Sequence, residues 1–285
     1  MKQPVLELRN VTRVFHRSGL LRRMFTASTE PPALDGVSLR IESREVVGIV
    51  GESGSGKSTL AQIAVGLLKP SSGDVLLNGE PMSELLRQRD KSWRRRVQMV
   101  FQDTGSALNP RKSVARCLTE TLKLRGVGKA DRQREAVEML RLVGLDESIM
   151  ARLPHELSGG QRQRVGIARA LAMKPDVLIA DEPVSALDVS LQAQVVNLLI
   201  RLTAELGLTL VFISHDLALV RSLCSRVVVM RAGKIVEQGP SLKVLDHPEH
   251  PYTQLLRAAV PKGYAGRAAS AHTETQPILL DTASR

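Results

Sequence analysis

Gly-Glu-Ser-Gly-Ser-Gly-Lys-Ser occupies residues 51–58, directly after a short apolar run at residues 45–50 and before helical spacing at residues 58–68. The order of strand, glycine-rich loop and helix is the context in which G-x-x-x-x-G-K-[ST] binds phosphate. Glycines let backbone N–H groups turn inward toward an anion, and the helix N-terminus adds its positive end. A chance turn rich in glycine and serine would not need this order, so we expect phosphates to bind here.

Two side chains of this loop have distinct expected roles. Lys57 places a positive charge near the β- and γ-phosphates, and Ser58 offers a hydroxyl to Mg²⁺. The motif indicates a nucleoside triphosphatase without indicating which kind. The residues expected to contact the nucleotide are Gly51, Glu52, Ser53, Gly54, Ser55, Gly56, Lys57, Ser58 and Thr59.

A second apolar run, Val-Leu-Ile-Ala at residues 177–180, ends in the adjacent acids Asp181 and Glu182. The C-terminal ends of parallel strands form the ligand crevice of an α/β sheet. Phosphoryl transfer needs positioning and charge compensation, so one acid for the metal and one for the attacking water suffice. We expect Asp181 to hold Mg²⁺ and Glu182 to orient the water. The alternative is an ordinary strand end before a turn at Pro183.

Leu-Ser-Gly-Gly-Gln at residues 157–161 indicates a helix start that leaves backbone amides uncovered. Ser158 is a good N-cap residue, and Gln161 three positions later completes a capping-box pattern. Gly159 and Gly160 would let phosphate oxygens approach the helix end. A plain capped helix is the alternative explanation for these residues.

Taken together, these motifs resemble those of the ABC ATPases, in which Leu-Ser-Gly-Gly-Gln is the signature. The resemblance implies a Q-loop at Gln102, which touches Mg²⁺ and senses a transmembrane partner, and a D-loop ending at Asp188. It also implies a switch histidine at His215, close to the γ-phosphate, and an adenine-stacking ring at Phe15. The family closes two subunits head to tail, so that Ser158, Gly160 and Gln161 would cap the ATP of the partner.

Four further stretches are similar to the ATPases of oligopeptide, dipeptide and nickel importers. They are Val-Phe-Gln-Asp at residues 100–103, Ser-Ala-Leu-Asn-Pro-Arg at 106–111, the run at 182–194, and His-Pro-Tyr-Thr at 250–253. The sequence at residues 184–190 and the basic loop at 16–33 resemble the corresponding segments of the second ATPase of such systems. This implies a heterodimer with another ATPase, two permease subunits, an extracytoplasmic solute-binding protein, and a peripheral location on the cytoplasmic face of the membrane.

The cargo and two rival functions stay open. Peptides are the expected cargo, with nickel or a metal–chelator complex as the alternative. A soluble ABC ATPase of translation or repair usually has two cassettes or long coiled coils, and a non-catalytic subunit would not need Glu182 and His215. Many importer relatives have a cysteine-rich tail, but no cysteine follows Thr253 here, so we expect no iron–sulfur cluster.

The expected fold is α/β: a P-loop NTPase core with an antiparallel β subdomain and a helical insert. The domain should span residues 5–256, with the helical subdomain at about 103–172 and a partly disordered extension at 257–285. Strands are expected at residues 5–14, 37–41, 45–50, 75–77, 177–180, 208–214 and 227–230, and helices at 58–68, 113–124, 131–143, 159–173 and 191–206.

The composition narrows the classes of ligand and excludes some structural features. The 285 residues carry a net charge of +11, which suits phosphorylated ligands, nucleic acid or an anionic membrane surface. Aromatic residues make up only 2%, which argues against base stacking on single-stranded nucleic acid. Two distant cysteines predict no disulfide framework. No apolar leader or run of about 18 apolar residues is present, so we expect neither a signal peptide nor a membrane span.

Overall fold

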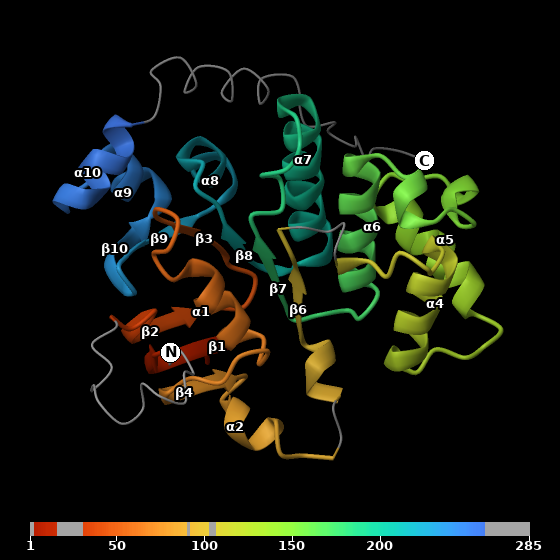
Figure 1. Cartoon of the computed structure of the whole chain (residues 1–285), viewed down its shortest axis with the longest axis horizontal. Coiled ribbons are helices and arrows are strands. Elements are labelled where there is room, and N and C mark those ends of the chain that lie inside the picture. The colour runs from red at the N-terminus through yellow and green to blue at the C-terminus, as the bar shows by residue number, and fades with distance from the viewer. Residues whose placement is uncertain (1–2, 16–30, 90–91, 103–106, 260–285) are drawn as a thin grey trace, which may run out of the picture.

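The apolar run before the glycine-rich loop forms β3 (Val46–Val50), an inner strand of a six-stranded sheet in the order β10-β9-β3-β8-β7-β6 (Figure 1). The computed structural model describes residues 3–15, 31–89, 92–102 and 107–259. Neighbouring strands pair in parallel, except that β10 pairs antiparallel with β9. The other strands of this sheet are β6 (Val97–Val100), β7 (Val177–Asp181), β8 (Thr209–Ile213), β9 (Arg226–Arg231) and β10 (Lys234–Pro240).

The register of this sheet brings two predicted motifs to one edge. Ile213 on β8 lies opposite Ile49 on one side and opposite Asp181 on the other. The chain passes from Ile49 into the glycine-rich loop, and Asp181 ends β7. The phosphate-binding loop and the two acids are therefore separated by the single strand β8, as expected for parallel strands whose C-terminal ends share an edge.

A second sheet is antiparallel and confirms the expected β subdomain. Its order is β2-β1-β4-β5, and all its pairs are antiparallel. Asn10 has a φ of 50° at a register shift of β1, so the expected strand at residues 5–14 contains an irregularity. The four strands are β1 (Leu6–Arg13), β2 (Leu34–Ile41), β4 (Ser72–Leu77) and β5 (Glu80–Pro81).

The central strands β3, β7 and β8 of the large sheet are buried on both faces and divide their side chains between two apolar cores. Val211 and Ile213 of β8 belong to the core shared with α1 (Lys57–Ala64) and the antiparallel sheet. Leu210 and Phe212 face the opposite way, into the core shared with the helices on the other side. Side chains alternate along a strand, so an unbroken apolar run predicts a strand covered on both faces.

The helical insert lies beyond β6 in Figure 1 and consists of α4 (Val114–Arg125), α5 (Arg132–Leu142) and α6 (Gly159–Leu171). All three helices were predicted. Ser113 caps α4 by accepting a hydrogen bond from the Arg116 N–H, and α4 ends at Gly126 in a left-handed conformation, φ 97°. The apolar faces of α4 and α5 continue the core of the large sheet. The exact domain boundaries stay a prediction.

The remaining elements are short helices, apart from the long helix α7 (Val189–Leu206). Gly207, with φ 61°, ends α7 at the predicted position, after residue 206. The short helices are α2 (Met82–Leu85), η2 (Ser92–Arg95), η3 (Glu147–Ile149), η4 (Pro154–Glu156), α8 (Leu217–Leu223), α9 (Ser241–Asp246) and α10 (Pro251–Ala258).

Three differences from the sequence-based expectation have physical reasons. α1 ends at Ala64 and not near Leu68, because Gly66 adopts φ 73° and breaks the helical path. β6 was not predicted, since four residues give too short an alternation. α8, α9 and α10 were also not predicted, and each has at most eight residues. Expectations for residues 16–30 and 260–285 lie outside the described residues.

Candidate active site

The glycines of the 51–58 loop are required by close contacts and by backbone conformation. Gly51, Gly54 and Gly56 have φ of 151°, 79° and 103°, all in the region that favours glycine. A Cβ at Gly51 would lie 2.2 Å from the Met230 carbonyl oxygen, and one at Gly56 would lie 2.5 Å from the Ala33 carbonyl oxygen. The loop is thus wedged between the end of β9 and the start of β2.

The loop has exposed residues at its tip and a buried lysine, Lys57, below them. Glu52, Ser53 and Gly54 are exposed, whereas Ser55 is buried. Lys57 is only 5% exposed, and its Nζ donates hydrogen bonds of 2.8 Å to the carbonyls of both Gly51 and Glu52. Burial lowers the pKa of Lys57, although the carboxylates of Glu182, Asp181 and Glu52 act in the opposite direction.

Asp181 has the surroundings of a metal ligand. It is 5% exposed, and its Oδ1 makes no hydrogen bond. Burial raises the pKa of Asp181, and the nearby Glu182 charge acts in the same direction, while the hydrogen bond from Ser58 and the Lys57 charge oppose it. Ser58 and Thr59 lie in the first turn of α1, with Ser58 exposed and Thr59 half-buried.

This donor set fits Mg²⁺ bound together with phosphates. Mg²⁺ usually binds through one or two protein oxygens, with phosphates and water completing its octahedron. Within the described ranges, no three His, Cys, Asp or Glu side chains cluster to form a protein-only metal cage. One buried carboxylate oxygen without a partner, next to a serine hydroxyl, is the arrangement that a shared phosphate–metal site needs.

The three predicted catalytic side chains come together although they are far apart in sequence. Gln102 Nε2 donates to Glu182 Oε2 at 3.1 Å, and His215 Nδ1 lies 3.5 Å from the same oxygen. Gln102 follows β6, Glu182 follows β7 and His215 follows β8, so neighbouring strand ends supply all three. The Glu182 side chain is 19% exposed and that of His215 is 64% exposed, which leaves room for a ligand.

The backbone of Glu182 is unusual, and the sequence alone did not indicate it. Its φ is 45°, in the left-handed region where a residue with a Cβ is strained. The Glu182 N–H donates to the Ile213 carbonyl at 3.0 Å, and the Ser185 hydroxyl donates to the Glu182 carbonyl at 3.1 Å. These two bonds hold the backbone of Glu182 in this conformation.

The capping box predicted at the start of α6 is present. Ser158 Oγ accepts from the Gln161 N–H at 3.2 Å, and Gln161 Oε1 accepts from the Ser158 N–H at 3.0 Å. A Cβ added to Gly160 would lie 3.1 Å from a methyl group of Leu191, and one added to Gly159 would lie 3.3 Å from a methyl group of Leu187. The two glycines therefore let α6 pack closely on the segment that contains Asp188.

Asp188 and Phe15 each have contacts of their own. Asp188 caps α7, because its carboxylate accepts from the Leu191 N–H at 2.9 Å. The Phe15 ring is 46% exposed and lies under the Arg13 guanidinium, 4.8 Å from it. An exposed ring can accept a base on its free face, so the role of Phe15 in adenine binding stays a prediction. In Figure 1, α6 lies on the far side of β6 and β7 from α1.

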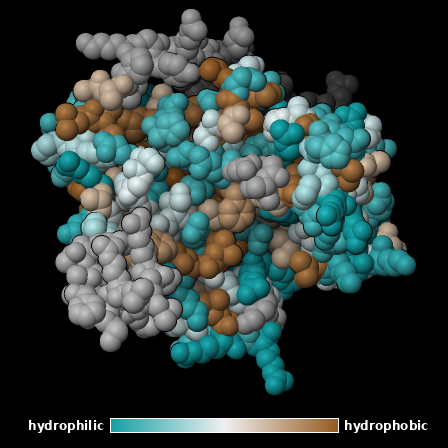
Figure 2. Space-filling view, viewed as in Figure 1, coloured by the Kyte–Doolittle hydropathy of each residue, from teal (hydrophilic) through white to brown (hydrophobic). Residues whose placement is uncertain are grey.

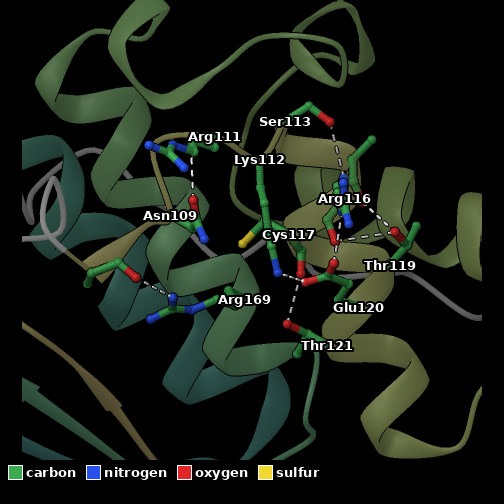
Figure 3. A network of polar contacts seen from close by, with 12 residues as sticks. Asn109, Arg111, Lys112, Ser113, Arg116, Cys117, Thr119, Glu120, Thr121 and Arg169 are labelled. Carbon is green, nitrogen blue, oxygen red and sulfur yellow. Dashed lines mark hydrogen bonds and ion pairs between the residues drawn. The ribbon is translucent and has the colours of Figure 1, made fainter.

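A separate cavity of about 220 Å³ lies in the helical insert. Figure 3 shows its polar wall, where Glu120 accepts from Lys112 and Arg116 at 2.5 and 3.0 Å. Arg169 of α6 donates to the Ala107 carbonyl at 2.7 Å and so joins two sides of the cavity lining. Burial raises the pKa of Cys117 in this wall, despite the opposing charge of Arg169.

One contact of the loop was missed by sequence reasoning. The Tyr252 hydroxyl on α10 accepts a 3.0 Å hydrogen bond from the Glu52 N–H, across 200 positions of sequence. Its His-Pro-Tyr-Thr segment was noticed as a family resemblance only. Nothing in the local pattern indicates where a tyrosine at a helix start would dock.

Comparisons with known proteins agree with this geometry. A family model described as "ABC transporter" matches residues 34–185. The chain is 47% identical to the oligopeptide transport ATP-binding protein AppF of Bacillus subtilis over 91% of this chain and 79% of that protein. It is 45% identical to the oligopeptide transport ATP-binding protein OppF of Streptococcus mutans over 92% of this chain and 83% of that protein.

Solved structures give the same result. The ATP-binding cassette MJ0796, a dimer in a post-hydrolysis state bound to ADP and Pi, matches with a TM-score of 0.72 and 31% identity, over 83% of this chain and 98% of that chain. The protein cbiO1 of Clostridium perfringens, part of the ABC transporter complex cbiONQ, matches with a TM-score of 0.73 and 29% identity, over 92% and 98%. No helix in the described part of the chain is long and apolar enough to cross a membrane.

Proposed function

Since the chain belongs to the ABC transporter family of ATPases, we propose that it hydrolyses ATP to energise an importer of oligopeptides or dipeptides. The observation that carries the catalytic part is the meeting of Glu182, Gln102 and His215 beside a lysine-containing phosphate loop. The names of the AppF and OppF relatives, both oligopeptide transport ATP-binding proteins, support the peptide cargo.

The residues of this chain divide the work of hydrolysis. The loop amides and Lys57 bind the β- and γ-phosphates, while Asp181, Ser58 and Gln102 would hold Mg²⁺. Magnesium bound with ATP supplies positive charge that offsets the negative charge on the phosphate oxygens in the transition state. Glu182 orients a water molecule and accepts a proton from it, as the water oxygen bonds to the γ-phosphorus and the bond to the β–γ bridging oxygen breaks to release ADP and phosphate. His215 contacts the γ-phosphate from the other side of Glu182.

We infer that each nucleotide is completed by a second ATPase subunit. α6, which begins with the signature residues, packs on one face of the large sheet and α1 packs on the other (Figure 1). We therefore expect Ser158, Gly159, Gly160 and Gln161 to cap the ATP of a second subunit and not that of their own chain. The dimeric MJ0796 cassette supports a head-to-tail pair. The start of α6 suits this role, because the positive end of a helix dipole at its N-terminus attracts phosphate oxygens. Asp188, at the start of α7, would lie at the same interface.

Replacing Ser158 with alanine should separate the local and the intersubunit roles of this residue. The lost N-cap should lower the free energy of unfolding by about 1 kcal/mol. It should also reduce the ATPase rate of the assembled pair roughly tenfold, because the partner's ATP loses a hydroxyl contact. The rate is measured by phosphate release at saturating ATP.

Ser113→Ala is the matched control for Ser158→Ala. Ser113 caps α4 in the same way, through the Arg116 N–H, and lies outside the proposed interface. The Ser113→Ala variant should lose a similar amount of free energy of unfolding and keep its ATPase rate. Equal rates for the two variants would contradict the intersubunit role.

We infer that the cavity formed by α4 and residues 107–112 receives a helix of a permease subunit. Apolar side chains such as Leu108 and Val114 line it, and Lys112, Glu120 and Arg169 supply charged groups. This arrangement would place a transmembrane subunit near Gln102, and therefore near Glu182. The proposed assembly contains two permeases, a partner ATPase and an extracytoplasmic solute-binding protein, with this chain peripheral on the cytoplasmic face of the membrane.

Reconstitution tests the proposed cargo. The chain, its partner ATPase, both permeases and the binding protein are placed in proteoliposomes with ATP, and uptake of radiolabelled tri-alanine is measured. Peptide should stimulate ATP hydrolysis severalfold and accumulate inside. Stimulation by a nickel–histidine complex and not by peptide would overturn the peptide assignment while keeping the importer.

A further inference from the structure

The entrance of the phosphate loop is held by residues from the C-terminal part of the chain. The Met230 carbonyl presses against Gly51, where a Cβ would come within 2.2 Å. Gly233, in the turn between β9 and β10, donates its N–H to the Ser55 carbonyl at 3.0 Å. The contact of Tyr252 with Glu52 is the third of this series and uses a side chain, so it can be removed without altering the backbone.

Tyr252 is built into the protein rather than lying on its surface. It is 2% exposed, its hydroxyl accepts the Glu52 N–H at 3.0 Å, and the Arg231 guanidinium covers its ring at 4.8 Å. Figure 1 shows α9 and α10 beside β10, at the end of the six-stranded sheet. The opposite side of these helices is exposed, with Leu242 and Leu255 at 58% and 66%, and Figure 2 shows apolar side chains there.

The start of α10 is fixed so that the phenol reaches the loop. Glu237 on β10 accepts hydrogen bonds from the N–H groups of Glu249 and His250 at 2.9 and 3.2 Å. His250 Nδ1 then caps the helix by accepting the Tyr252 N–H at 3.1 Å. Pro251 occupies the first helical position, where a missing N–H has no cost. The backbone of Tyr252 is therefore anchored to β10 immediately before its side chain leaves toward Glu52.

The Gly51–Glu52 peptide connects this anchor to Lys57. Its N–H, on Glu52, is held by Tyr252, and its carbonyl, on Gly51, accepts from Lys57 Nζ at 2.8 Å. A change at Tyr252 would thus alter the peptide on which Lys57 rests. We propose that Tyr252 is a positioning residue for nucleotide binding, whose hydroxyl lets the C-terminal helix fix the entrance of the phosphate loop. This rests on the proposed role of the loop in ATP binding.

Tyr252→Phe tests the proposal, because it removes one oxygen and keeps the ring under Arg231. The full chain is titrated with a non-hydrolysable ATP analogue and Mg²⁺, and the ATPase rate is measured with the partner subunit. A lost hydrogen bond that leaves an amide unpaired should weaken nucleotide affinity and raise KM roughly three- to tenfold. At saturating ATP, kcat should stay within about twofold, since the bound triphosphate itself orders the loop. Exchange of the Glu52 amide with solvent, followed by NMR, should accelerate by a similar factor.

Leu255→Ala on the exposed side of the same helix is the control and should change none of these quantities. The proposal is wrong if the Glu52 amide of the Tyr252→Phe variant exchanges faster with solvent but the variant binds nucleotide as tightly as the natural chain. It is also wrong if only the thermal midpoint falls, since that result means a purely structural role. Lys57→Ala, measured in parallel, separates the two levels: unchanged affinity there would refute the loop assignment itself, whereas weakened affinity there with no effect of Tyr252→Phe refutes only the role of Tyr252.

Discussion

Replacing Glu182 with glutamine is expected to lower kcat for ATP hydrolysis roughly 10²–10³-fold while nucleotide binding is retained. Glutamine has nearly the same shape, and its amide oxygen can still accept the hydrogen bond from Gln102 that now measures 3.1 Å. It has no negative charge, however, and cannot take a proton from water. ATP should therefore bind and stay intact, so the closed pair of subunits should accumulate and elute earlier in size-exclusion chromatography with Mg-ATP.

Glu205→Gln is the matched control for this prediction. Glu205 lies on the exposed side of α7, where it pairs with Arg201 at 3.3 Å. The same chemical change there should leave kcat and the elution position unaltered. Ordinary turnover in Glu182→Gln, with the protein folded and ATP bound, would remove Glu182 from the mechanism and leave His215 as the group to test next.

Replacing Lys57 with alanine is expected to weaken the binding of Mg-ATP about 10- to 100-fold. A hydrogen bond to a charged group contributes about 1.5–3 kcal/mol, and Lys57 offers several at a buried position. The variant also leaves the carbonyls of Gly51 and Glu52 without the donor that each has at 2.8 Å. The loop should consequently become less ordered without nucleotide, and the dissociation constant is measured by calorimetry.

Lys123→Ala is the control for Lys57→Ala. Lys123 is an exposed residue near the end of α4, so its loss removes one positive charge without touching the loop. Its affinity for Mg-ATP should match that of the natural chain. Affinity that falls equally in both variants would show that the overall positive charge, and not the position of Lys57, attracts the nucleotide.

The parts of the site that sequence predicted are those coded by short local patterns. The loop glycines, the Ser158–Gln161 capping box and the acids at the end of β7 each depend on residues within ten positions of one another. Helix and strand periodicity also sufficed for α7 and β8. Such features follow from backbone geometry and burial, which repeat along the chain at fixed spacing.

The parts that sequence did not predict depend on distant partners. The strand β6 has four residues and is recognisable only from its pairing with β7. The contact of Tyr252 with Glu52 joins positions 200 apart, and the path of the chain around the sheet decides it. The left-handed backbone of Glu182 has no local signal either, since glutamate rarely adopts it.

The left-handed backbone at Glu182 creates a trade-off between thermal stability and ATPase activity at this one position. A residue with a Cβ in this region costs about 1–3 kcal/mol, and the cost at Glu182 is borne by the rest of the fold. Glycine would relieve the torsion but would lack the carboxylate. Directed evolution that selects only for survival at high temperature should therefore replace this glutamate early. The thermostable variants that it yields would hydrolyse ATP slowly.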